Sequence, residues 1–220
     1  MDTLKAFVSY STEDKRLAGK IKEVLVYYGI DVFLAHEDLT PSSEWQTEII
    51  KKVAACDVFM PLHTDNFRLS EWTDQESGMA MMSEKIIMPI HVTRNPHGFL
   101  RRYQAYSLDS SKDEITKSCT NLVLAMKLRP ELSTKLQNSA IQSFVKSGSY
   151  ADANSKCDFL DEFGPFEKNQ VNIIINGSIS NSQIYRAGNA CRKLKQFYLR
   201  YEKEIDIGFK PLFKELFEIS

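Results

Sequence analysis

The segment from Ser70 to Glu76, which reads SEWTDQE, places an aromatic ring and a carboxylate four residues apart, directly after an apolar strand-like run. If this segment opens a helix, Trp72 and Glu76 lie one turn apart on the same face and can flank a single ligand. A tryptophan four residues from a glutamate is more often a buried ring beside a solvated charge. The pair therefore becomes informative only through the elements that position it.

The composition is that of a soluble globular chain with no dominant charge. It has 220 residues, 43% of them hydrophobic, enough for one large domain or two small ones. With 28 basic and 29 acidic side chains the formal net charge is -1, so we expect no nucleic acid partner. No charged and apolar leader precedes the first strand-like segment, and no apolar run approaches the roughly 18 residues of a membrane span. We expect a cytoplasmic protein without membrane association.

The spacing of histidines and cysteines indicates neither a metal site nor a set of disulfides. The four histidines show no metal-ligand spacing, and the four cysteines are spread too widely for a zinc site or a disulfide framework: Cys56, Cys119, Cys157 and Cys191. Neither GxGxxG nor a P-loop occurs. We therefore expect no metal and no bound cofactor, and any pyrophosphate would be held by loop amides and helix N-termini, such as the one opened by Ser11.

Strand-like and helix-like segments alternate through about residue 126. The strand-like runs cover residues 5–10, 31–35, 57–62 and 85–92, with a short edge strand expected within 103–108. Runs that are apolar on both faces and separated by helices imply a parallel sheet covered on both sides. Ligands of such sheets bind beyond the carboxyl ends of the strands, where the loops after Tyr10, Ala35 and Leu62 should converge. Pro61 and Pro89 fit central strands poorly, because each lacks a donor for the ladder.

The pattern changes after residue 130, where apolar residues recur at helical spacing and strand signals are few. Residues 184–201 read as one amphipathic helix of about five turns, and a last helix is expected around 209–217. Residues 171–175 (VNIII) fit a lone strand, but a buried helical segment is favoured. We predict a small all-α region at 131–220.

The order of these segments resembles that of the Toll/interleukin-1 receptor (TIR) domain over about residues 4–126. Residues 7–10 (FVSY) stand where that family has its first box, and residues 36–44 occupy the position of its BB loop. Residues 70–76 match the SxWxxxE pattern of enzymatically active members. The resemblance implies a TIR domain at 1–128 with a flavodoxin-like, doubly wound α/β fold, followed by a helical domain of unknown role at 131–220.

The resemblance also implies cleavage of NAD+ between nicotinamide and ribose, with NAD+ as substrate. It assigns Glu76 as the catalytic residue, and it assigns the substrate contacts to Tyr10, Ser11, Leu34, Ala35, Trp45 and Trp72. Trp45 also lies on an apolar helical stripe with Ile49 and Val53, so a core position for this ring stays open. In the resembling enzymes a neighbouring copy often completes the pocket through the BB loop, which implies self-association.

The chemistry suits one carboxylate, because nicotinamide leaves a cationic pyridinium as a neutral molecule and needs no general acid. Positive charge then builds on the ribose, where a fixed carboxylate stabilises the transition state. Water gives ADP-ribose, and an internal nucleophile gives a cyclic isomer. We interpret the chain as an NAD+ nucleosidase of a prokaryotic defence or signalling system, in which the helical region receives an activating partner or ligand. The alternatives are a non-catalytic TIR adaptor and, less well supported, a receiver-like phosphoacceptor domain.

Overall fold

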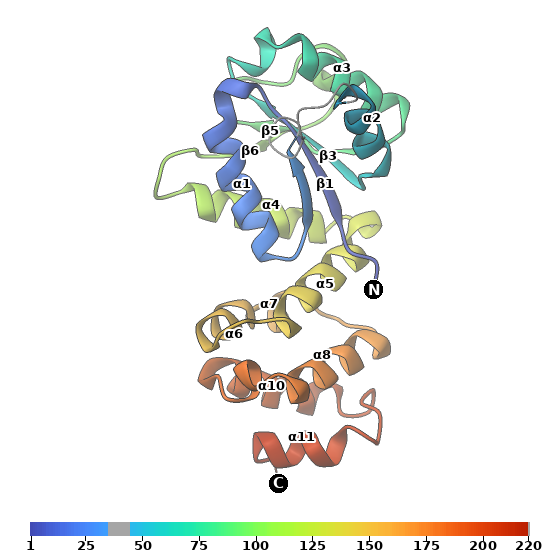
Figure 1. Cartoon of the computed structure of the whole chain (residues 1–220), viewed down its shortest axis with the longest axis vertical. Helices are drawn as coiled ribbons and strands as arrows, with labels where there is room; N and C mark the ends of the chain where they lie inside the picture. The colour runs from blue at the N-terminus through green and yellow to red at the C-terminus, as the bar shows by residue number, and fades with distance from the viewer. Residues whose placement is uncertain (35–44, 220) are drawn as a thin grey trace. The chain divides into compact units, whose positions relative to one another are not determined.

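The computed structural model describes residues 1–34 and 45–219, without the side chain of Trp45. The chain divides into two compact units (Figure 1). The first, here called the sheet unit, comprises Thr3–Val26 and Ile30–Ser133. The second, the helical unit, comprises Met1–Asp2, Tyr27–Gly29 and Thr134–Ser220. Within the described residues, no helix combines the length and the apolar composition that crossing a bilayer requires.

The sheet unit is built on a parallel sheet in the order β2-β1-β3-β5-β6, with β4 also paired to β3. Because β4 and β5 are successive pieces along the same side of β3, the order is that of a flavodoxin-like fold. The predicted fold class is therefore confirmed. The strands are β1 (Lys5–Ser9), β2 (Asp31–Leu34), β3 (Val58–His63), β4 (Ile86–Ile87), β5 (Ile90–His91) and β6 (Tyr106–Ser107).

The two prolines behave differently in the sheet. Pro61 lies inside the central strand β3, opposite Ser9 of β1. Pro89 separates β4 from β5, so the single strand predicted over 85–92 was wrong in its continuity. A proline donates no hydrogen bond to the ladder, which explains the break. Its carbonyl still accepts a hydrogen bond from the backbone of Tyr106, at 2.8 Å, and thereby aligns β6.

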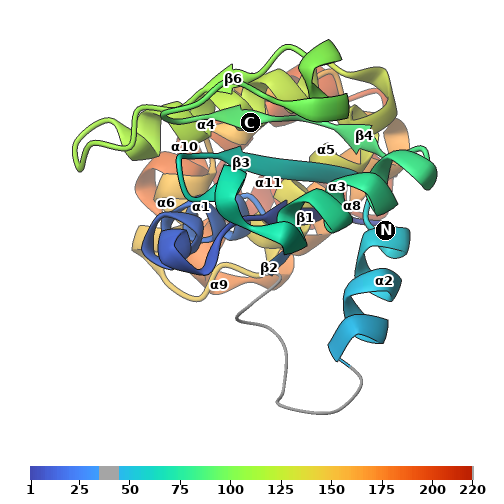
Figure 2. The same cartoon turned by 90° about the horizontal axis from the view of Figure 1, so that it is seen from above.

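Helices cover both faces of the sheet. Figures 1 and 2 place α1 (Lys15–Tyr27) and α4 (Ile115–Lys127) on one side, and α2 (Trp45–Ala55) and α3 (Glu71–Met82) on the other. Beneath α2 and α3 a buried cluster joins Phe7 and Phe59 of the sheet to Ile49, Val53 and Ala80 of the helices. Short 3-10 helices complete the loops: η1 (Thr12–Asp14), η2 (Phe67–Leu69) and η3 (Gly98–Arg102).

The helical unit has the predicted all-α character, with differences at particular boundaries. Residues 171–175 lie within a helix, as favoured. The single helix predicted over 184–201 is wrong, because the chain leaves the helix at Arg186 and Ala187 and starts again at Gly188. The helices are α5 (Pro130–Val145), α6 (Tyr150–Lys156), α7 (Phe159–Glu162), α8 (Lys168–Ser180), α9 (Ser182–Tyr185), α10 (Gly188–Tyr201) and α11 (Lys210–Phe217).

Candidate functional site

Glu76 is fully buried on α3, against the carboxyl end of β1. The hydroxyl of Ser9, the last residue of that strand, donates a hydrogen bond of 2.5 Å to Glu76 Oε2. Side chains alternate along a strand, so Ser9 shares the face of Phe7, which is the face that α3 covers. Both Ser9 and Glu76 have no exposed surface. The carboxylate therefore lies at the rim of the sheet where ligands of this fold class bind.

Burial raises the pKa of Glu76 to about 7, and the hydrogen bond from Ser9 opposes that rise. Among the described residues, Glu76 Oε1 has no hydrogen-bond partner. A buried carboxylate with an unsatisfied oxygen is costly, because the charge is desolvated without full compensation. Groups held in this way are concentrated at functional sites, where the binding partner is a ligand.

Trp72 lies one turn before Glu76 and is half-buried, so its indole ring is not enclosed in the hydrophobic core. The start of α3 is fixed by Thr73, whose hydroxyl donates to the carbonyls of Phe67 and Ser70 at 2.8 and 2.7 Å. Residues four apart on a helix lie on one face, so the indole and the carboxylate are neighbours on α3. This arrangement agrees with a ring at the edge of a ligand site.

The other predicted substrate contacts fall partly at the same rim. Tyr10 and Ser11 follow β1 directly, and Leu34 ends the neighbouring β2; all three are buried. Ser11 precedes η1 without capping it through its side chain. Ala35 and the predicted BB loop at 36–44 lie outside the described residues, as does the side chain of Trp45 at the start of α2. The substrate-binding roles of all these residues stay predictions.

Two residues at this rim were missed by the sequence interpretation. Ser9 was quoted only as part of the FVSY motif, although strand alternation from Phe7 indicates which way its hydroxyl points. Asp14, in η1, was not singled out from the sequence. Its carboxylate accepts hydrogen bonds from Thr64 Oγ1 at 2.5 Å and Asn66 Nδ2 at 2.9 Å. It therefore ties the loop after β1 to the loop after β3, a long-range link without a local sequence signal.

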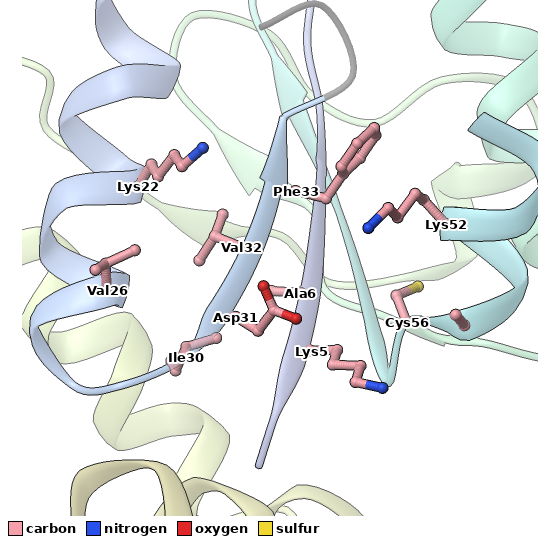
Figure 3. A pocket seen from close by; sticks show the side chains of 11 residues that line it. Lys5, Ala6, Lys22, Val26, Ile30, Asp31, Val32, Phe33, Lys52 and Cys56 are labelled. Carbon is pink, nitrogen blue, oxygen red and sulfur yellow. The ribbon is translucent and has the colours of Figure 1, made fainter. Parts of the chain in front are cut away.

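A cavity of about 530 Å³ lies at the other end of the strands (Figure 3). It is bounded by Lys5 and Asp31, the first residues of β1 and β2, and by side chains of α1 and α2 that include Lys22 and Lys52. Lys52 lies over the ring of Phe33, 5.3 Å from its centroid. This cavity is at the amino ends of β1 and β2, away from the rim that holds Glu76, and we assign it no part in the chemistry.

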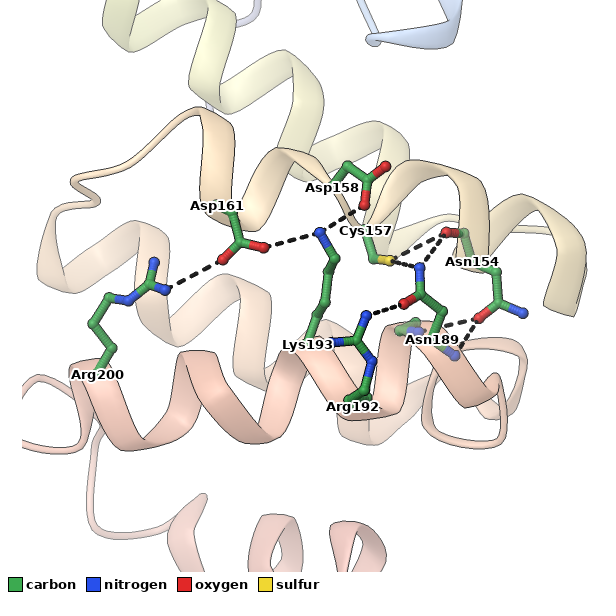
Figure 4. A network of polar contacts seen from close by, with 9 residues as sticks. Asn154, Cys157, Asp158, Asp161, Asn189, Arg192, Lys193 and Arg200 are labelled. Carbon is green, nitrogen blue, oxygen red and sulfur yellow. Dashed lines mark hydrogen bonds and ion pairs between the residues drawn. The ribbon is translucent and has the colours of Figure 1, made fainter.

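The helical unit carries a polar network between α10 and the segment around α7 (Figure 4). Lys193 pairs with Asp158 at 2.6 Å and with Asp161 at 2.9 Å, and Arg200 also contacts Asp161 at 3.2 Å. The acidic and basic side chains of the network therefore pair with one another. Burial lowers the pKa of Lys193, but the hydrogen bonds that it donates to the two aspartates outweigh burial and raise the pKa. The network fits a stabilising role better than a catalytic one.

The geometry defines a flavodoxin-like α/β unit with a buried carboxylate at its ligand rim. Residues 6–123 match the family model of the TIR domain, and the chain belongs to the TIR domain family. One similar solved structure is the TIR domain of the Toll-related receptor TRR-2 from Hydra magnipapillata, with 19% identity and a TM-score of 0.44 over 53% of this chain and 93% of that one.

A second similar structure is the CMP N-glycosidase BcmB from Clostridium botulinum, with 14% identity and a TM-score of 0.39 over 54% of this chain and 98% of that one. No curated protein sequence matches the chain significantly. At these TM-scores the two structural similarities carry no argument about activity, which has to come from the site itself.

Proposed function

We propose that the sheet unit is an NAD+ nucleosidase, which cleaves the bond between nicotinamide and ribose with Glu76 as the catalytic residue. One observation supports this proposal most strongly. Glu76 is buried at the carboxyl rim of the sheet with one carboxylate oxygen bound to Ser9 and the other without a partner among the described residues. In the proposed complex this unpaired oxygen accepts a hydrogen bond from a ribose hydroxyl or faces the charge that develops on the ribose. Because Glu76 has no exposed surface before binding, the side chains around it have to move to admit the substrate.

In the proposed reaction the glycosidic bond breaks and its electron pair leaves with nicotinamide, which becomes neutral. The ribose carries the positive charge as an oxocarbenium ion, which the Glu76 carboxylate stabilises. Water then adds to the sugar carbon and loses a proton, which gives ADP-ribose. Attack by a nucleophile of the same molecule gives a cyclic isomer instead. A glycosidase with a poor leaving group needs a second carboxylic acid, and this leaving group does not.

The alternative, a TIR adaptor without catalysis, explains the family but not the carboxylate. An adaptor works through surface contacts, and Glu76 has no exposed surface with which to make one. Its ionisation is opposed by burial, so at neutral pH it makes the folded state less stable. A scaffold gains nothing from such a residue. We infer that catalysis accounts for it better.

The test is to incubate the purified chain with NAD+ over a range of protein concentrations and to follow free nicotinamide. We expect turnover by the wild-type chain and its loss in Glu76→Gln, which keeps the shape and removes the charge. Glu71→Gln is the matched control, because Glu71 lies on the same helix but is exposed. Equal turnover in wild type and Glu76→Gln would refute the assignment. Separating linear from cyclic ADP-ribose identifies the second step.

The same experiment also tests self-association, because TIR domains generally associate with other TIR domains. If a neighbouring copy completes the pocket, the rate per chain rises with protein concentration. Strict proportionality between rate and concentration in dilute solution would contradict this. The proposal leaves the helical unit as the receiver of an activating partner or ligand, and adding or removing residues 134–220 in the assay addresses that role.

A further inference from the structure

A basic cavity of about 590 Å³ lies at the same rim of the sheet, beyond the carboxyl end of β5. Its walls come from η2, from the loop after β5 and from η3. The charged and polar side chains that line it are all of kinds that can donate hydrogen bonds: Arg68, His91, Thr93, Arg94, Asn95, His97 and Arg101. The residues that line it include no carboxylate.

Two of the three arginines are available to a ligand. Arg94 is paired with Asp65, and His97 Nε2 lies 3.1 Å from Asp74 Oδ1. Arg68 and Arg101 have no hydrogen bond or ion pair of their side chains with any residue that the structure describes. Two unpaired guanidinium groups at one cavity create a local positive field, although the whole chain is nearly neutral.

The walls of the cavity are held in place by buried neighbours. Arg68 follows Phe67, which is fully buried, and Arg101 follows Leu100, which is 3% exposed. The loop that follows β5 is held by the carbonyl of His63. This carbonyl accepts hydrogen bonds from the backbone N–H groups of residues 92, 93 and 94, at 3.1, 3.3 and 3.3 Å. A ligand therefore meets a wall whose backbone is already arranged, which lowers the cost of binding.

The size of the region suits more than a simple ion. A second cavity of about 420 Å³ shares His91, Asn95, Pro96 and Arg101 with the first and extends toward Tyr103 and Gln104. Each cavity falls within the range of sites that hold small organic ligands, and Arg101 lines both. Arginine matches phosphate oxygens in a bidentate geometry, so phosphate is the anionic group that fits these donors best.

We propose that Arg68 and Arg101 form a binding site for a phosphate-bearing ligand of nucleotide size. The ligand has two possible sources, the pyrophosphate of the NAD+ substrate and a separate nucleotide. Phosphate binding itself does not depend on NAD+ cleavage, because it is measured without turnover. The two arginines anchor the phosphate, and the cavity beside Tyr103 receives the remainder of the ligand.

The test is calorimetric titration of the full chain with inorganic pyrophosphate and with AMP at low salt. We expect both probes to bind the wild-type chain, and the double variant R68Q/R101Q to bind them about tenfold more weakly or worse. The double variant R68K/R101K keeps the charge but loses the fork, so its affinity should fall between the two. Arg16→Gln is the control, because Arg16 is an exposed arginine on α1 of the same unit and lines neither cavity.

Failure of either probe to bind the wild-type chain, or equal binding by wild type and R68Q/R101Q, would overturn the proposal. Arg68 and Arg101 are exposed, so R68Q/R101Q should melt at the wild-type temperature, which shows that any lost binding is not lost folding. The source is decided by titrating NAD+ into Glu76→Gln with and without saturating pyrophosphate. Competition assigns the site to the substrate, and unchanged NAD+ affinity assigns it to a separate ligand.

Discussion

Replacing Glu76 by glutamine should stabilise the sheet unit at neutral and alkaline pH and leave it almost unchanged in acid. Burial raises the pKa of this carboxyl from its ordinary value of 4.5 to about 7, so the folded chain holds a proton that the unfolded chain releases. The folded state is therefore penalised progressively as the pH rises from 4.5 through 7. One pKa unit corresponds to about 1.4 kcal/mol, which gives a penalty of about 3 kcal/mol at pH 8 and about 0.2 kcal/mol at pH 4.

The assay is urea unfolding at a series of pH values, followed by tryptophan fluorescence. Both tryptophans of the chain, Trp45 and Trp72, belong to the sheet unit, so the signal reports the unfolding of that unit. The quantity to compare is the free energy of unfolding of Glu76→Gln minus that of wild type. The exposed Glu71→Gln is the control and should show no such dependence. A difference that stays constant from pH 4 to pH 8 would refute the reasoning, because it would show that Glu76 does not titrate with a raised pKa.

Three further predictions concern titration at the same rim. If ionised Glu76 is the catalytic form, kcat/KM should rise with pH and level off above about 7, as a rate profile will show; a flat profile contradicts this. Ser9→Ala removes the hydrogen bond that lowers the pKa of Glu76, so the same profile should move to higher pH, by about one unit or more. Burial lowers the pKa of His63 from 6.5 to about 4, so wild type should lose about 3 kcal/mol of stability through this residue as the pH falls through that range. His63→Phe should abolish that acid loss in urea unfolding, and equal acid sensitivity would argue against it.

The sequence was sufficient for the parallel sheet, because each strand is a local apolar run separated from the next by a helix. The flavodoxin-like fold class followed from the resemblance to TIR domains. The sequence was also sufficient to place Glu76 near the rim, since residues 70–76 follow the central strand after a short connection that contains η2. The prediction of element boundaries from periodicity was wrong where a single proline or glycine interrupts an otherwise regular pattern. Pro89 splits a run of apolar residues into β4 and β5, and Gly188 starts a new helix within a continuous amphipathic pattern. A glycine within a helical pattern weakens it, so the chain can turn there.

The contacts that define the site were harder to predict than the elements that carry it. The hydrogen bond from Ser9 to Glu76 joins residues 67 positions apart, and Asp14 reaches Thr64 across 50 positions. Such pairs depend on how far each helix is shifted along its neighbouring strand, and periodicity within one segment carries no information about that shift. The basic cavity has the same origin, because Arg68 and Arg101 come from loops that follow different strands. Neither arginine was singled out from the sequence.

The electrostatics of Glu76 agree with the proposed substrate. Its pKa is set by burial and by the neutral hydroxyl of Ser9, with no contribution from a cation among the described residues. His63, at the end of the neighbouring strand β3, is held neutral above about pH 4 by its own burial. In the proposed reaction the substrate brings a positive charge to this carboxylate. A pyridinium ring, or the oxocarbenium ion that follows its departure, supplies that charge beside the carboxylate and favours the ionised form on which the proposed chemistry depends.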